Sequence, residues 1–380
     1  MLPSSRRTDY WQYYNPDYAW DDDNGVADFI GSRELSEEEF ANGGFSAEET
    51  EALLSSGYSA FFGRVIDRYY GGLLQSVDGR TRFAIKEFRQ AFSGATNNVP
   101  AYPAKSIEDL RNCVNRWQSS TRRRMLFRGQ IAAYSVTRPR PNPFFQVAGF
   151  GEVSLLPSIW RRMIAARPPA RQNFRNLHIL EWLRVIRSTF DPNEVKRRIE
   201  AARGAGRWMN SSQDLEESND PLLIKLGRFE RDIIMGMDFN LATPLVTLLQ
   251  HYGLLSPVLD LTSDLDVALF FATNRYQPGS DGQFCSYTNV GTNGRRSVLY
   301  VIRENKTEME VHERDRVLED LDPLRPKRQS CVVCRSSPDA MNLAVDFLEG
   351  IITLDFDDVP CCMEPLIYSR GSMKTGSCKP

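Results

Sequence analysis

The sequence predicts an α+β fold, in which a small mixed or antiparallel sheet is surrounded by helices. Short apolar runs such as those within "RRRMLFRGQ" and "GRRSVLYVIRE" are typical of buried strands. Stretches such as "NLHILEWLRVIRS" repeat apolar residues at helical spacing and lie between these strands. The predicted strands are too few and too widely separated along the chain for an all-β domain.

The composition is typical of a soluble globular protein. The 380 residues are 41% hydrophobic and 25% charged, and a formal net charge of −2 gives no global field that favours nucleic acid or a membrane. The start, "MLPSSRRTDYW", lacks the apolar core of a signal peptide, and no apolar run reaches the roughly 18 residues that a bilayer requires. We therefore expect a cytoplasmic protein without a membrane segment.

The cysteines do not indicate a metal site. Their number, seven, is odd, which favours reduced thiols over a disulfide framework. Cys331 and Cys334 form a CxxC pair, and Cys361 and Cys362 are adjacent. A zinc site needs a second pair at ligand spacing, which adjacent cysteines supply poorly. We expect no bound metal.

The first hundred residues divide into two regions. Residues 1–35 are rich in aromatic and acidic residues without helical or strand periodicity, which predicts a flexible lead or a docking tail for a basic partner. Residues 36–100 are expected to be mostly helical, with a helix capped by Ser46 and two more over residues 63–92. The turn-rich "NNVPAYPAKS" then marks a domain boundary.

An arginine ends the first strand predicted after this boundary. The apolar run of residues 125–127 stops at Arg128 and Gly129. This pattern predicts a buried strand whose end delivers an arginine into a cleft, followed by a glycine that lets the backbone approach closely. Between Arg111 and Arg207 arginines greatly outnumber acids, which indicates either a solvated surface or a groove for phosphate-bearing ligands.

Polar residues gather at element boundaries in "TPLVTLLQHYGLLSPVLDLTSDLDVALFFAT". His251 lies in the last turn of a predicted helix, off its apolar stripe, where it is either structural or functional. A short strand ends near Asp260, and Thr262 follows it. Ser263 fits a capping box with Asp266, so its hydroxyl is explained either by capping or by ligand binding.

Four motifs occur in order along the chain: "LFRGQ" at 126–130, "LLPSIWRR" at 155–162, "LLQHYGLLSPVLDLTSDLDVALFFA" at 248–272 and "RPKRQSCVV" at 325–333. Together they resemble the FRG domain, a family named after its Phe-Arg-Gly motif. The resemblance covers residues 105–360, which makes residues 361–380 a C-terminal tail. The chain departs from the family pattern at Leu261, where tryptophan is common, and at Ser330, where glycine often follows the glutamine.

A second likeness implies a chemistry. The chain has an arginine ending a strand, then a hydroxyl-bearing turn that opens a helix, then a polar strand residue, an order similar to that of ADP-ribosyltransferases. In that group the arginine holds NAD, the turn supports the pocket, and a glutamate orients the reacting ribose. The resemblance therefore implies NAD-binding roles for Arg128, Thr262 and Ser263.

The glutamate of that group has no clear counterpart in this chain. Gln329 stands in the motif where an acid is expected, and neither Glu349 nor Glu364 lies in a supporting motif. His251 and Asp260 are the candidates for a general base or for orienting an acceptor. The predicted catalytic residues are therefore Arg128, His251, Asp260 and Gln329.

Two functional hypotheses follow. The first is an NAD-using transferase, an effector of toxin or antiphage type that modifies a nucleic acid or protein facing the Arg-rich stretch 111–207. The second is a non-catalytic nucleotide-binding or regulatory module that uses the same cleft. In both, the residues expected to contact NAD are Arg128, Gly129, Gln130, Thr262 and Ser263.

A purely structural interpretation is also open. In it, Arg128 and Asp260 form an ion pair and the surrounding block only packs. A nuclease is less favoured, because no paired-carboxylate metal motif stands out. The sequence leaves the oligomeric state open.

Overall fold

The computed structural model describes residues 33–67, 82–92, 99–121, 124–158, 189–238, 242–251, 254–278, 285–290, 297–306, 309–311, 328–334 and 347–356, with positions 182, 185 and 326. The predicted lead up to residue 32 and the predicted tail at 361–380 lie outside the described residues. The described residues belong to two compact units. One lies between Pro157 and Val258, and the other combines Ser32–Leu156 with Leu259–Pro380.

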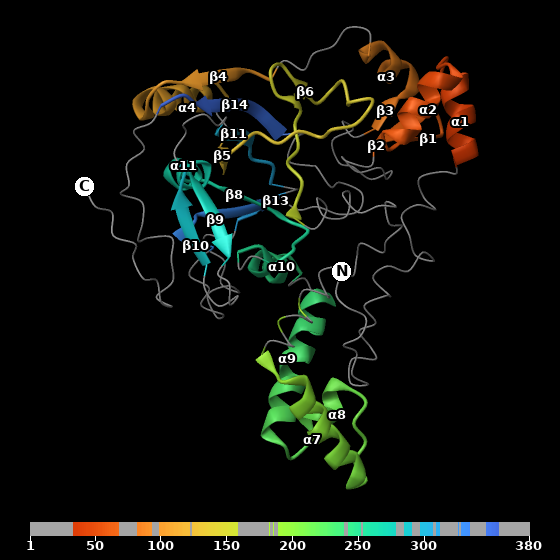
Figure 1. Ribbon diagram of the computed structural model, residues 1–380, viewed down its shortest axis with the longest axis vertical. Coiled ribbons are helices and arrows are strands. Elements are labelled where there is room, and N and C mark those ends of the chain that lie inside the picture. Colours follow the sequence, from red (N-terminus) through yellow and green to blue (C-terminus); the bar gives the residue numbers. More distant parts are fainter. Residues whose placement is uncertain are drawn as a thin grey trace. The chain divides into compact units, whose positions relative to one another are not determined.

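A mixed seven-stranded sheet is the main sheet of the second unit (Figure 1). Its strands, in spatial order, are β12 (Met309–Val311), β13 (Cys331–Cys334), β8 (Leu259–Thr262), β5 (Met125–Gln130), β11 (Val298–Arg303), β14 (Leu348–Leu354) and β4 (Ala101–Ala104). Neighbouring strands are antiparallel except β14 and β4, which are parallel. The sheet, with helices packed against it, confirms the predicted α+β class.

The core of this unit lies between the sheet and two helices, α4 (Ile107–Thr121) and α11 (Leu265–Thr273). Figure 1 shows α4 beside β4 and β14. The buried residues of this core are Ala104, Leu110, Cys113, Val114, Met125, Phe127, Ala268, Leu269, Ala272, Leu299, Val301, Ile352 and Leu354. Residues Val298–Ile302 of β11 are buried without interruption, which explains why its sequence is almost continuously apolar rather than alternating.

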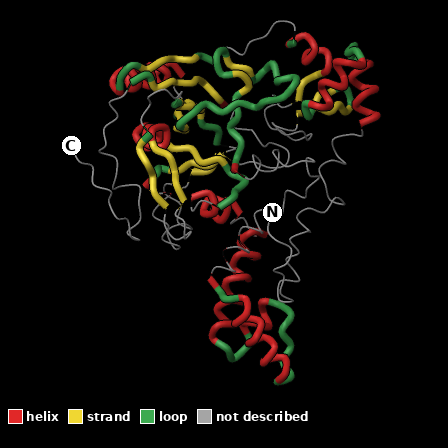
Figure 2. Tube along the Cα trace, in the orientation of Figure 1, coloured by secondary structure: helices red, strands yellow, loops and turns green. Residues whose placement is uncertain are grey.

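The amino-terminal part of the second unit combines helices with a small antiparallel sheet (Figure 2). Its elements are α1 (Arg33–Asn42), α2 (Ala47–Ser55), β1 (Tyr58–Phe61), β2 (Arg64–Asp67), β3 (Arg82–Ala84) and α3 (Ile85–Ala91). The predicted start of α2 is confirmed, because Ser46 and Glu49 form a reciprocal capping box.

The prediction of two helices over residues 63–92 is wrong for the part that β2 and β3 occupy. The hairpin between β1 and β2 turns through Phe62 and Gly63, whose φ angles are 48° and 70°. Positive φ at both central residues closes a two-residue hairpin with the twist that the strands require. The prediction of a helix is wrong here because it did not take this turn into account.

Two short ladders complete the second unit. β6 (Gln146–Val147) pairs with β7 (Gly151–Glu152), and β9 (Asn274–Pro278) pairs with β10 (Cys285–Asn289), both antiparallel. The β9–β10 ladder follows α11 directly, because Asn274 is both the last cap of that helix and the first residue of β9.

The first unit is helical in its described residues. The helices whose bounds are described are α7 (Pro192–Gly204), α8 (Ser212–Glu216), α9 (Pro221–Asp238) and α10 (Ala242–His251). α7 begins at Pro192 with Asp191 as its cap, and proline suits the first position of a helix. Across the part of the chain that the structure describes, no helix has both the length and the apolarity to cross a bilayer.

Candidate functional site

Arg128 projects from the face of the main sheet opposite the α4–α11 core. Side chains alternate along a strand, and Met125 and Phe127 of β5 belong to that core. Arg128 and Gln130 therefore share the other face. Tyr300 of β11 is the register partner of Arg128, so its side chain lies on the same face beside it. We call Arg128, Gln130 and Tyr300 the Arg128 face.

An ion pair to the neighbouring strand holds Arg128. Its Nη1 donates to both the backbone carbonyl and the carboxylate Oδ1 of Asp260, each at 2.6 Å. The two side chains are 14% and 25% exposed, so the pair is partly shielded from water. This is the ion pair of the structural interpretation, and it also fixes the orientation of the guanidinium.

The Arg128 face carries buried polar atoms that lack partners. Among the described residues, Nε of Arg128, Oε1 of Gln130 and the hydroxyl of Tyr300 make no hydrogen bond of normal geometry. Burial raises the pKa of Tyr300 to about 12. The nearby Tyr134 amide lowers this pKa, but by less than burial raises it. Buried polar groups are nearly always hydrogen-bonded. A bound polar ligand would explain why one donor, one acceptor and one hydroxyl on this face make no such bond.

The hydroxyl of Thr262 is already engaged within the protein. It donates to the carbonyl of Gln329 at 2.7 Å and accepts from the amide of Asp264 at 3.0 Å. These bonds hold the end of β8 against the turn before β13. Thr262 and Gln329, two of the predicted site residues, therefore lie together, and the contact between them serves the fold.

The predicted capping box of Ser263 and Asp266 is wrong. α11 begins at Leu265, and its N-cap is Asp264, whose carboxylate accepts from the amides of Asp266 and Val267. The amide of Ser263 donates instead to the carbonyl of Ser330 at 3.1 Å. Both Ser263 and Asp264 are good capping residues, and the sequence alone does not decide between adjacent positions.

Gly129 lies on the opposite face from Arg128. A side-chain carbon at this position would overlap the carbonyl of Ala268 and would lie 2.8 Å from the amide nitrogen of Ala272. The absence of a side chain thus lets α11 pack directly on β5. The sequence predicts that the backbone approaches a neighbour closely at Gly129. The structure confirms a close approach, and the neighbour is helix α11.

His251 ends α10 in the first unit, whereas the other predicted site residues belong to the second unit. Its side chain is 8% exposed. Of the predicted acids, Glu349 forms an ion pair with Arg303 at 3.5 Å, and Glu364 lies outside the described residues. Among the described residues, no three Asp, Glu, His or Cys side chains gather as metal ligands would.

Several of the described arginines in the stretch 111–207 are engaged in ion pairs rather than free. Arg111 pairs with Asp266 at 3.1 Å, and Arg124 pairs with Glu304 at 3.3 Å. In the first unit, Arg197 and Arg198 pair with neighbouring acids. Arg140 is one of the described arginines of this stretch without an ion pair.

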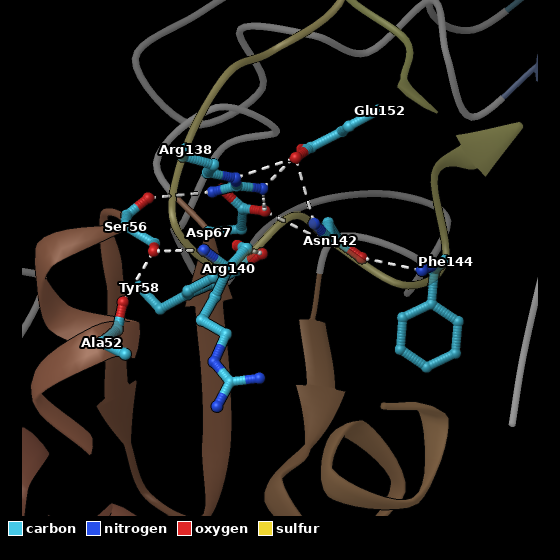
Figure 3. A network of polar contacts seen from close by, with 9 residues as sticks. All are labelled: Ala52, Ser56, Tyr58, Asp67, Arg138, Arg140, Asn142, Phe144 and Glu152. Atoms are coloured by element: carbon cyan, nitrogen blue, oxygen red, sulfur yellow. Dashed lines mark hydrogen bonds and ion pairs between the residues drawn. The ribbon is translucent and has the colours of Figure 1, made fainter. Parts of the chain in front are cut away.

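Sequence reasoning also missed a buried polar network (Figure 3). Arg138 is at its centre with a side chain 2% exposed, and the carboxylates of Asp67 and Glu152 are 0% exposed. Arg138 donates to Asp67 at 2.9 and 2.6 Å and to Glu152 at 2.9 and 2.5 Å. We call these residues, with Ser56, Tyr58 and Asn142, the Arg138 network.

The network links the β1–β2 hairpin to the segment that precedes β7. Asn142 donates its side-chain nitrogen to Asp67 at 2.9 Å and its amide to Glu152 at 3.0 Å. Burial by itself lowers the pKa of Arg138, but the charge of Asp67 and its hydrogen bonds raise that pKa far above its usual value. The guanidinium therefore stays charged, and the network holds two segments together that are distant in sequence.

In the comparison with known proteins, one family model matches part of the chain. The model of the FRG domain matches residues 206–281. The match contains the block at 248–272, with His251, Asp260, Thr262 and Ser263, and it stops short of "LFRGQ" and "RPKRQSCVV". The wider limits of 105–360 stay a prediction. No curated protein and no solved structure matches the chain.

Proposed function

We propose that this chain, which carries an FRG-domain segment at residues 206–281, binds a nucleotide on the Arg128 face, with NAD as the ligand to test. The observation that carries the proposal is the set of buried polar atoms on that face. They belong to Arg128, Gln130 and Tyr300, and among the described residues they make no hydrogen bond of normal geometry.

The chemistry of these groups suits a nucleotide. A guanidinium that one carboxylate already orients still presents further N–H donors, which match the oxygens of a phosphate. The Tyr300 hydroxyl and the Gln130 amide can bond to the hydroxyls or the amide of NAD. Tyr300 is fully buried and the Arg128 side chain is 14% exposed, and this shielding from water strengthens each of these interactions.

Binding without turnover is favoured over transfer by what the structure leaves for catalysis. The hydroxyl of Thr262 is engaged by Gln329 and Asp264, and Glu349 is paired with Arg303. A nucleotide-binding or regulatory module requires neither residue to be available.

ADP-ribosyl transfer is the second candidate, and the position of Asp260 beside Arg128 favours it. In this reaction the bond between the ribose carbon and the nicotinamide nitrogen breaks, and nicotinamide leaves with the electron pair. The acceptor nucleophile bonds to the ribose carbon and loses its proton to the Asp260 carboxylate. A toxin or antiphage role, and an acceptor molecule, are proposed only for this transferase candidate.

A calorimetric titration with NAD, together with a measurement of nicotinamide release, distinguishes the binding module from the transferase. We expect the full chain to bind NAD in calorimetry, and Arg128→Gln to weaken binding by about tenfold or more, since it removes a charge-assisted contact. Arg303→Gln is the matched control, because it removes another ion-paired arginine from the same sheet. Nicotinamide release during incubation with NAD would establish the transferase candidate. Absence of both binding and release would refute the proposed function.

A further inference from the structure

A cavity of about 600 Å³ lies in the amino-terminal part of the second unit. Its charged and aromatic lining comes from α2, α3 and nearby loops and consists of Phe45, Glu49, Lys86, Arg89, Phe92 and Arg140. No residue of the Arg128 face contributes to it. Sites for small molecules typically measure about 300–1,000 Å³, so this cavity has room for a ligand of nucleotide size.

The cavity carries an excess of positive charge. Lys86, Arg89 and Arg140 are three cations against the single carboxylate of Glu49. Within the described residues none of the three cations forms an ion pair. Glu49 itself is engaged in the α2 capping box, where it accepts from the amide of Ser46 at 2.8 Å.

The pKa of Glu49 reflects the same arrangement. It is lowered first by the hydrogen bond from the Ser46 amide and further by the charges of Arg89 and Arg140. Both guanidinium groups therefore act on the interior of one cavity. With Glu49 ionised, three cations against one anion leave an excess of two positive charges.

The two arginines are held in place before any ligand arrives. The Arg89 guanidinium lies over the ring of Phe45 at 5.8 Å, and that of Arg140 lies over Phe92 at 6.0 Å. Stacking on an aromatic ring restricts a guanidinium while leaving its N–H edges open to an anion.

The Arg138 network fixes the backbone of Arg140. The amide of Arg140 donates to the hydroxyl of Ser56 at 2.8 Å, and its carbonyl accepts from the hydroxyl of Tyr58 at 3.0 Å. Figure 3 shows the Arg140 side chain pointing away from the ion pairs of Arg138. The buried network thus positions a cation for the cavity, which lowers the entropic cost of binding.

We infer that this cavity binds the phosphate groups of a small, multiply charged molecule. Planar guanidinium groups match phosphate oxygens in pairs, and an ammonium adds a point charge. Phe92, which is half-buried, offers an apolar surface to whatever the phosphates carry. Inorganic pyrophosphate and adenosine diphosphate share this chemistry, and they differ in whether an organic body adds to the affinity.

The test is calorimetric titration of the full chain with pyrophosphate and, separately, with adenosine diphosphate, without magnesium. We expect for each a saturable site that Arg128→Gln leaves intact and that weakens as sodium chloride is added because the charges are screened. Arg140→Gln and Arg89→Gln should each weaken binding about tenfold, whereas Arg140→Lys, which keeps the charge but loses the planar geometry, should weaken it less. Arg64→Gln is the control, because Arg64 is exposed, makes no ion pair among the described residues and does not line the cavity.

The outcomes separate this inference from the proposed function. No pyrophosphate binding at millimolar concentration, or equal affinity for wild type, Arg89→Gln and Arg140→Gln, overturns it. Tighter binding of adenosine diphosphate identifies a nucleotide, and equal binding identifies a free polyphosphate. Loss of NAD binding in Arg140→Gln but not in Arg128→Gln would support the cavity and refute the proposed function of the Arg128 face.

Discussion

Removing Arg138 tests how much the buried network contributes to stability. Arg138→Ala would leave the carboxylates of Asp67 and Glu152, both 0% exposed, without the guanidinium that donates to them. Breaking a buried ion pair by deleting one partner typically costs about 3–5 kcal/mol, because the remaining charge is buried without compensation. With two carboxylates on one guanidinium, we expect a loss at the upper end of that range.

The comparison is an exposed arginine with the same number of partners. Arg33 pairs with Glu37 and Glu51, and its side chain is 61% exposed. Arg33→Ala should leave the free energy of unfolding close to that of wild type, since exposed pairs gain little in water. Both arginines belong to the second unit, so one unfolding reporter in that unit serves both variants.

The assay is urea unfolding at neutral pH, with the free energy of unfolding measured for wild type and both variants. Arg138→Lys is included in case Arg138→Ala does not fold, because it keeps the charge and loses the paired geometry. It should lie between wild type and Arg138→Ala. An Arg138→Ala variant within 1 kcal/mol of the wild-type stability would refute the view that the network holds these segments together.

Three further predictions concern the sheet and its helix. Gly129→Ala should destabilise the second unit by about 3 kcal/mol in urea unfolding, because the added methyl would meet the backbone of Ala268; unchanged stability would contradict the packing described for α11. The pKa of Tyr300 is about 12 in the folded protein, above the ordinary value of 10. Its neutral hydroxyl therefore contributes about 2–3 kcal/mol to the free energy of unfolding below pH 10, and this contribution is lost between pH 10 and 12. Tyr300→Phe should remove that loss of stability at alkaline pH. Unfolding curves of both proteins across this pH range check it, and parallel pH profiles would contradict it. Asp264→Ala should lower stability by about 0.5–2 kcal/mol and Ser263→Ala by much less, since Asp264 is the cap; the reverse order would restore the predicted capping box.

The central strands β5 and β11 of the main sheet were predictable because burial fixes their composition. The apolar runs at residues 125–127 and 298–302 become β5 and β11, which are buried against α4 and α11. The β1–β2 hairpin was not, because its turn depends on a positive φ at Phe62. A phenylalanine rarely adopts that conformation, so no ordinary turn signal marks the position.

The candidate site was predictable in part. Arg128 and Asp260 each lie in a polar position of a short strand, and the structure joins them. Tyr300 was missed because its relation to Arg128 depends on strand register, which an apolar sequence does not reveal. The Arg138 network was missed for a similar reason, since Asp67 and Arg138 are 71 residues apart.

The most direct test of the proposed function is the affinity for NAD of the wild-type chain, Arg128→Gln and Arg303→Gln, measured by calorimetry under one set of conditions. We expect saturable binding by wild type and by Arg303→Gln, and binding at least about tenfold weaker in Arg128→Gln. Equal affinity in all three proteins, or no binding by wild type, would contradict the assignment of a nucleotide to the face formed by Arg128, Gln130 and Tyr300.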